Sequence, residues 1–268
     1  IALFITEYLG EEKIQTKRTM VSILAMVVGC FSKAVYIPFL ALYWIMPRDK
    51  FYSRRQKNLF KAGIFVLLIL MFASFILPLI GNVSSGAEVG DYRGGDTSQT
   101  SQLSMILGYP LTYTGILLKS LGTTLVSYFI GSKVLANFAY RGIYDGIGYF
   151  VVLLTMLFTF VTDFGMTDKI YDAQMKRKIS VMKIWNGILI FGTACLVWTA
   201  LYLDFTPVGS MVINGVSPRY YLPLIFPLSL IFMNQKVRCS FKLETYQTLI
   251  TILMLFGTGI TIYCLMLA

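Results

Sequence analysis

The sequence contains no histidine. This absence excludes histidine-ligated zinc sites, the usual Ser-His-Asp triad and the commonest general base of enzymes. Charged residues are also scarce, at 13% of the 268 residues. A soluble domain of this size needs a more polar surface, so the composition argues against a soluble protein.

Cysteine is infrequent and shows no metal-binding spacing. Three of the four cysteines lie inside apolar segments, and the set is scattered along the chain as Cys30, Cys195, Cys239 and Cys264. They are typical of small packing residues in an apolar environment. No cofactor is predicted, and nothing in the sequence requires a divalent metal.

Apolar residues, by contrast, are abundant and come in long blocks. They make up 56% of the chain, and the mean hydropathy is +0.70. Blocks of roughly 20 residues match the length of helix that crosses a bilayer. The sequence therefore predicts an all-α, polytopic transmembrane helical bundle of about six or seven membrane helices. The blocks are Met20–Met46, Phe60–Ile80, Ile106–Ile130, Ile147–Val161, Ile184–Leu203, Tyr220–Met233 and Tyr246–Leu267.

The chain begins at Ile1 within an apolar stretch, without an initiating methionine or a signal-peptide pattern. We expect residues 1–268 to be the C-terminal part of one transmembrane domain whose N-terminal part is missing from this sequence.

The net charge of +10 comes mainly from lysines and arginines that flank the apolar blocks. This placement favours membrane topology and anionic headgroups over nucleic acid, and no nucleic-acid partner is predicted. If Ile106 to Ile130 does not cross, fourteen basic residues lie in inner loops and five in outer segments, before the N-terminal stretch is assigned. Basic loops stay in the cytoplasm, so we predict outer loops at about 82–146 and 204–219 and an interfacial or re-entrant helix on the outer face. A bacterial cytoplasmic membrane is the predicted location.

The block from Met20 to Met46 carries Lys33 near its middle. It is either one long crossing or a tight hairpin of two half-length helices that turns near Lys33. The hairpin is the preferred interpretation, because it keeps both basic flanks inside. At 27 residues the block is too short for two full spans.

Two cations are the main candidates for binding a phosphate. A charge far from either end of an apolar block, as at Lys33, is costly unless it serves a ligand or reaches water by snorkelling. Arg219 follows an outer loop and offers a planar fork of donors suited to phosphate, while Tyr220 and Tyr221 are placed to stack on a sugar. An ordinary belt of interfacial anchors gives the same pattern at Arg219.

A polar outer segment supplies carboxylates, a guanidinium and amides, the groups that bind hydroxyl-rich ligands. A flexible polar loop has the same composition. The candidate sugar or acceptor contacts are Asp91, Arg93, Asp96 and Gln102. Asp145 and Asp204 also border the outer face, as candidate bases or plain interface charges.

Three segments resemble the bacterial membrane-protein family known as domain-of-unknown-function family 2142. They are Ser32-Lys-Ala-Val-Tyr-Ile-Pro38, the stretch from Gln102 through Gly-Tyr-Pro110, and Val208 through Asn-Gly-Val-Ser-Pro-Arg-Tyr-Tyr-Leu-Pro223. The family is similar to GT-C glycosyltransferases, which transfer a sugar from a polyprenyl-phosphate carrier on the outer face of the membrane.

The resemblance implies a membrane enzyme with Lys33 and Arg219 as clamps on the carrier phosphate. Its partners would be a polyprenyl-phosphate-linked sugar, a surface polysaccharide acceptor and membrane lipids. The catalytic residue is unknown from this chain and, in the GT-C class, is expected near the N-terminus of the protein. Two alternatives stay open: a transporter or flippase of lipid-linked sugars, and a non-catalytic membrane subunit.

Overall fold

The computed structural model describes residues 1–31, 33–84, 97–137, 142–144, 146–162, 172–232, 237 and 240–266. In these ranges the regular elements are helices, and the only β-type pairing is an isolated bridge between Asn137 and Ile143. The predicted all-α fold is confirmed. The chain divides into unit 1 (Ile1–Ser120 and Tyr171–Val216) and unit 2 (Leu121–Ile170 and Ser217–Ala268).

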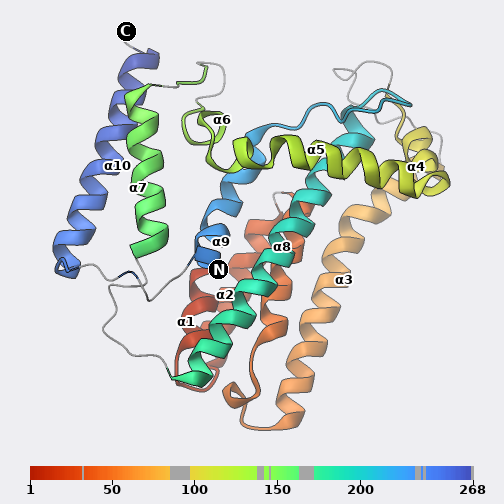
Figure 1. Ribbon diagram of the computed structural model, residues 1–268. Coiled ribbons are helices and arrows are strands. Elements are labelled where there is room, and N and C mark those ends of the chain that lie inside the picture. The colour runs from red at the N-terminus through yellow and green to blue at the C-terminus, as the bar shows by residue number, and fades with distance from the viewer. Residues whose placement is uncertain are drawn as a thin grey trace. The chain divides into compact units, whose positions relative to one another are not determined.

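Unit 1 is built around two long helices, α3 and α8, with a shorter helical hairpin packed against both (Figure 1). The hairpin contacts α3 and α8 mainly through its second arm, η1. The elements are α1 (Ala2–Leu9), α2 (Thr16–Phe31), η1 (Ala34–Ile45), η2 (Arg48–Lys50), α3 (Arg54–Ser84), α4 (Gln99–Gly108), α8 (Ala173–Phe205) and the first part of α5 (Pro110–Ile130).

The hairpin of α2 and η1 confirms the preferred interpretation of the block from Met20 to Met46. Ser22 Oγ lies 2.5 Å from Tyr43 Oη near its base, and Cys30 Sγ donates to the Tyr36 carbonyl near its turn. The second arm is a 3₁₀ helix that contains Pro38. At about 1.5 Å per residue for the α-helix and 2.0 Å for the 3₁₀ helix, both arms are about 24 Å long. The hairpin is therefore shorter than a hydrocarbon core of about 30 Å.

The base of the hairpin is held by aromatic and charged contacts. Phe4 of α1 packs on Tyr43, with ring centroids 5.1 Å apart. Lys50 is buried and donates to the carbonyls of Gly10 and Glu12, which follow the end of α1. Burial lowers the pKa of Lys50, and the nearby Lys178 lowers it further.

An ion pair joins the loop after the hairpin to the start of α8. Lys178 Nζ lies 2.5 Å from Asp49 Oδ2. Partial burial acts to raise the pKa of Asp49, but the hydrogen bond and positive charge of Lys178 outweigh it, so the net shift is downward. The basic segments around Arg48 and Lys178 therefore lie at the same end of unit 1, as the topology prediction requires.

Three helices in the described ranges are long and apolar enough to cross a membrane: Arg54–Leu77 within α3, α8 and α10 (Leu243–Met266). The segments Ala34–Ile45 and Ile147–Thr162 are shorter apolar helices. Although α5 has 21 residues, it is not among the candidate spans. Figure 1 shows its first half, the part in unit 1, lying crosswise over the ends of α3 and α8, as predicted for an interfacial helix.

Unit 2 contains a closely packed antiparallel helix pair, α7 (Ile147–Thr162) and α10. At one end of the pair, Thr162 Oγ1 lies 2.8 Å from Tyr246 Oη. At the other end Gly148 packs against Gly257 and Thr261, where a Cβ on Gly148 would lie 2.4 Å from Thr261 Oγ1. Small residues allow this close approach of two membrane helices. The unit also holds α6 (Ser132–Leu135), η6 (Pro218–Tyr221), α9 (Leu222–Phe232) and the second part of α5.

The topology can be tested with single cysteines in a protein whose four native cysteines are replaced. Thr100 and Gln174 are both exposed and lie at opposite ends of unit 1, the first in α4 and the second in the first turn of α8. In intact cells an impermeant maleimide should label Thr100→Cys and not Gln174→Cys, because basic segments stay inside. The reverse labelling pattern would invert the topology.

The glycine contact between α7 and α10 predicts a position-specific loss of stability. A Cβ at Gly257 would lie 2.9 Å from Val152 Cγ2, whereas one at Gly259 meets no atom within 4 Å. Gly257→Leu should lower the free energy of unfolding by about 1–3 kcal/mol through overpacking, and Gly259→Leu should change it little. Thermal unfolding in nanodiscs measures both variants, and equal melting temperatures would show that this contact is not formed.

Candidate functional site

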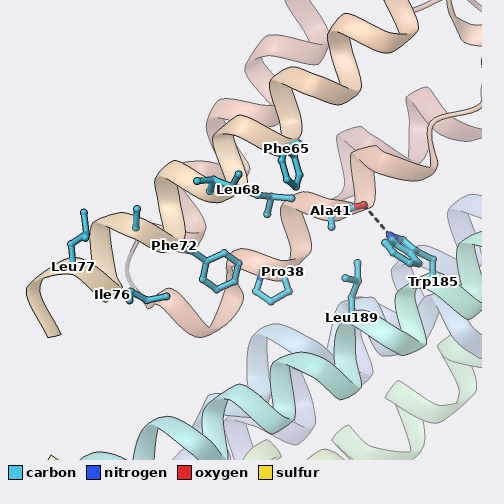
Figure 2. Close-up of a pocket in the computed structure, with 11 residues that line it drawn as sticks. Pro38, Ala41, Phe65, Leu68, Phe72, Ile76, Leu77, Trp185 and Leu189 are labelled. Atoms are coloured by element: carbon cyan, nitrogen blue, oxygen red, sulfur yellow. Dashed lines mark hydrogen bonds between the residues drawn. The ribbon is translucent and has the colours of Figure 1, made fainter. Parts of the chain in front are cut away.

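An apolar groove of about 670 Å³ runs between α3, η1 and α8 in unit 1. Figure 2 shows the side chains of α3 on one side of it, Pro38 and Ala41 of η1 opposite, and Trp185 and Leu189 of α8 beside them. All eleven lining residues are apolar: Pro38, Ala41, Phe65, Leu68, Ile69, Phe72, Ala73, Ile76, Leu77, Trp185 and Leu189. The indole N–H of Trp185 donates to the Ala41 carbonyl at 2.9 Å. Such a surface suits a lipid chain better than a polar ligand.

Lys33 lies at the hairpin turn, beside one end of this groove. Its side chain is exposed, its backbone is extended, and its N–H donates to the Cys30 carbonyl at 3.1 Å. Phe31, two residues earlier, contacts Phe75 of α3 with ring centroids 6.0 Å apart. The apolar block Phe60–Ile80 of α3 ends soon after this contact, so Lys33 lies near the predicted outer boundary of the hydrocarbon.

A polar cluster surrounds the C-terminal end of α8, which is predicted to face outward. Gln99 donates to the Asp204 carboxylate at 2.6 Å, and Tyr113 Oη donates to Thr199 Oγ1 at 2.6 Å. Gln102 is fully buried, and its amide N–H₂ donates to the carbonyls of Thr206 and Pro207. In this structure the Gln102 side chain fixes the loop after α8, and its predicted contact with a sugar or acceptor stays a prediction.

The loop after α8 folds back onto the helix that precedes it. The hydroxyl of Thr206 donates to the Leu201 carbonyl and accepts from the N–H of Asn214. Gly215 has a φ of +78°, and a Cβ there would lie 2.9 Å from Phe205 Cβ. The left-handed backbone and the close approach both require glycine at this position. The loop therefore has a defined shape up to the point where η6 begins.

Arg219 is exposed on η6 in unit 2, at the start of the helical segment that continues as α9. Its guanidinium lies over the ring of Tyr220, 6.0 Å from the centroid. The next residue, Tyr221, is fully buried against Tyr128 and Phe129 of α5. The buried tyrosine anchors η6, so the exposed Arg219 and half-buried Tyr220 are presented from a fixed backbone.

The predicted site residues therefore fall into three groups. Lys33 and Gln102 belong to unit 1, whereas Arg219 and Tyr220 belong to unit 2. Asp91, Arg93, Asp96 and Asp145 lie outside the described residues. Within the described ranges there is no cluster of three or more Cys, Asp or Glu side chains that could hold a metal ion.

The sequence did not reveal the groove or the buried Lys50. Apolar residues that line a groove and apolar residues that face lipid have the same composition. The sequence of α3 therefore could not show which of its side chains line the groove. Pro38 was the one available indication, because a proline in an apolar helix changes its geometry.

Comparison with known proteins identifies the family. No curated protein and no solved structure matches the chain. The family described as "Predicted membrane protein (DUF2142)" matches residues 1–228, which include the hairpin, the groove, the loop after α8 and Arg219. The chain therefore belongs to the DUF2142 family of predicted membrane proteins.

Proposed function

We propose that this protein is a GT-C-like glycosyltransferase that moves a sugar from a polyprenyl-phosphate carrier to a cell-surface polysaccharide, on the outer face of a bacterial cytoplasmic membrane. One observation carries the proposal. A hairpin with arms of about 24 Å brings the cation Lys33 beside an apolar groove, near the predicted outer end of the apolar part of α3. An anionic head joined to a long apolar chain is the ligand type that fits both features.

The reaction needs positive charge where the carrier phosphate leaves. A hydroxyl oxygen of the acceptor attacks the anomeric carbon, the bond from that carbon to the phosphate oxygen breaks, and the phosphate takes the electron pair. The hydroxyl proton passes to a general base that the described part of the chain does not identify. Charge develops on the leaving phosphate, so cations fixed at the membrane boundary lower the barrier.

Arg219 is the second cation in this proposal. It is exposed, its backbone is fixed by the buried Tyr221, and Tyr220 provides an aromatic face beside it. A guanidinium can contact two phosphate oxygens at once, and an aromatic ring can pack on a sugar. These features support a role in binding the phosphate and sugar of the donor.

Replacing Lys33 tests the proposal directly. Lys33→Met should lower sugar transfer from the lipid-linked donor by about a hundredfold or more, the usual effect of losing one preorganised charge, with normal expression and membrane insertion. Lys17→Met is the matched control, because Lys17 is exposed at the opposite end of the same hairpin. Normal turnover in Lys33→Met would show that Lys33 does not bind the phosphate and only anchors the hairpin turn by snorkelling.

Arg219 gives a separate test that depends on geometry. Arg219→Lys keeps the charge but loses the bidentate contact, so much of the transfer activity should be lost; Arg219→Ala should lose nearly all of it. The assay is transfer from a purified polyprenyl-phosphate sugar in nanodiscs, with thermal unfolding to confirm folding. Full activity in Arg219→Ala would leave the residue as an interfacial anchor. Movement of the carrier across the membrane without sugar transfer would instead indicate a flippase.

A further inference from the structure

The groove between α3, η1 and α8 has a definite direction. Its described lining residues run along α3 from Phe65 to Leu77, which is twelve residue steps and about 18 Å of helix. Figure 2 shows Trp185 and Ala41 toward one end and Ile76 and Leu77 at the other. The Leu77 end lies beside the hairpin turn, because Phe31 contacts Phe75 there. A chain in the groove would therefore have one end near Lys33.

Among the described residues that line the groove, none offers a hydrogen-bonding group to the middle of a ligand. Its lining residues are apolar, and the indole N–H of Trp185 is already bonded to Ala41. Burying a polar group on such a surface without a partner costs several kcal/mol. The occupant must therefore be apolar over the whole length of the groove.

Each end of the groove has a lysine near it, but the two lysines differ. Lys61 lies over the ring of Trp44, 5.7 Å from its centroid, and Trp44 packs on Phe65 at the inner end. This ammonium is bound to an aromatic face, an arrangement that anchors the helix end. Lys33 is exposed at the turn near the outer end. Because the proposed donor is used on the outer face, the proposed function puts the anionic head at the end near Lys33.

We infer that this groove binds the phosphate-proximal part of the carrier's isoprenoid chain. The inference rests on the proposed function, because it takes the carrier to be a polyprenyl phosphate. With carbon–carbon bonds of about 1.5 Å, one isoprene unit advances the chain by about 5 Å, so about 18 Å of groove holds three or four units. The rest of the chain then extends into the lipid.

A pair of matched substitutions in α3 tests the groove. Ala73 lines it, whereas Ala62 is exposed on the same helix and does not. Ala73→Phe should fill the groove and lower photolabelling by a benzophenone-bearing geranylgeranyl phosphate by about tenfold or more, as steric exclusion from an apolar pocket does. Ala62→Phe should label like the wild type. The full-length protein in nanodiscs is used, and thermal unfolding confirms that both variants fold.

Competition and a lysine comparison identify the occupant. Undecaprenyl phosphate should abolish the labelling, and Lys33→Met should weaken it more than Lys61→Met does. Equal labelling of Ala73→Phe and Ala62→Phe would overturn the groove assignment. Equally strong competition by phosphatidylglycerol would also overturn it, since the groove would then be a general acyl-chain site. A greater effect of Lys61→Met would place the head at the inner end and would contradict the proposed orientation.

The same samples separate this inference from the proposed function. If the wild-type protein is labelled as expected but transfers no sugar, the groove assignment stands and the proposed transferase activity is wrong. If the Ala73→Phe variant shows normal labelling and normal transfer, the groove assignment is wrong and the proposed transferase activity stands.

Discussion

The structure depends on a chain reversal inside an apolar environment. Backbone groups at membrane depth must be bonded within the protein, so a hairpin can turn there only if its turn is satisfied. The N–H of Lys33 bonds to Cys30 and its carbonyl accepts from Tyr36, while Ser22 and Tyr43 join the two arms nearer the base. This reversal brings Lys33 to the hairpin turn and puts η1 against α3 and α8, where it forms one wall of the groove.

The hairpin in turn depends on its anchoring at the inner end. Buried Lys50 holds the residues that follow α1, and the ion pair of Asp49 with Lys178 fixes the loop to α8. Removing Lys50 would leave the carbonyls that it contacts without their partner, which costs more than the contacts themselves contribute, whereas the ion pair is more exposed and contributes less. The basic segments that predicted the inner side therefore also have a structural role.

Much of this arrangement is predictable from the sequence, because membrane helices have strong length and composition signals. The apolar block that begins at Phe60 predicted α3, and Lys33 within 27 apolar residues predicted the hairpin. The 3₁₀ form of η1, the groove and the pairing of Asp49 with Lys178 were not predicted. They depend on tertiary contacts, and the two charged residues are 129 positions apart. Gln102 was predicted to contact a sugar or acceptor from an outer loop, and its burial, which the sequence did not indicate, comes from the loop after α8.

The central claim is that Lys33 recognises the phosphate of a lipid carrier, and a comparison of two ligands tests it most directly. Undecaprenyl phosphate and undecaprenol share the chain and differ in the phosphate, so the ratio of their Kd values isolates the headgroup contribution. The wild-type protein should prefer the phosphate, and Lys33→Met should reduce that preference by about tenfold or more, as expected for a close charge pair. An unchanged ratio in Lys33→Met would contradict the account.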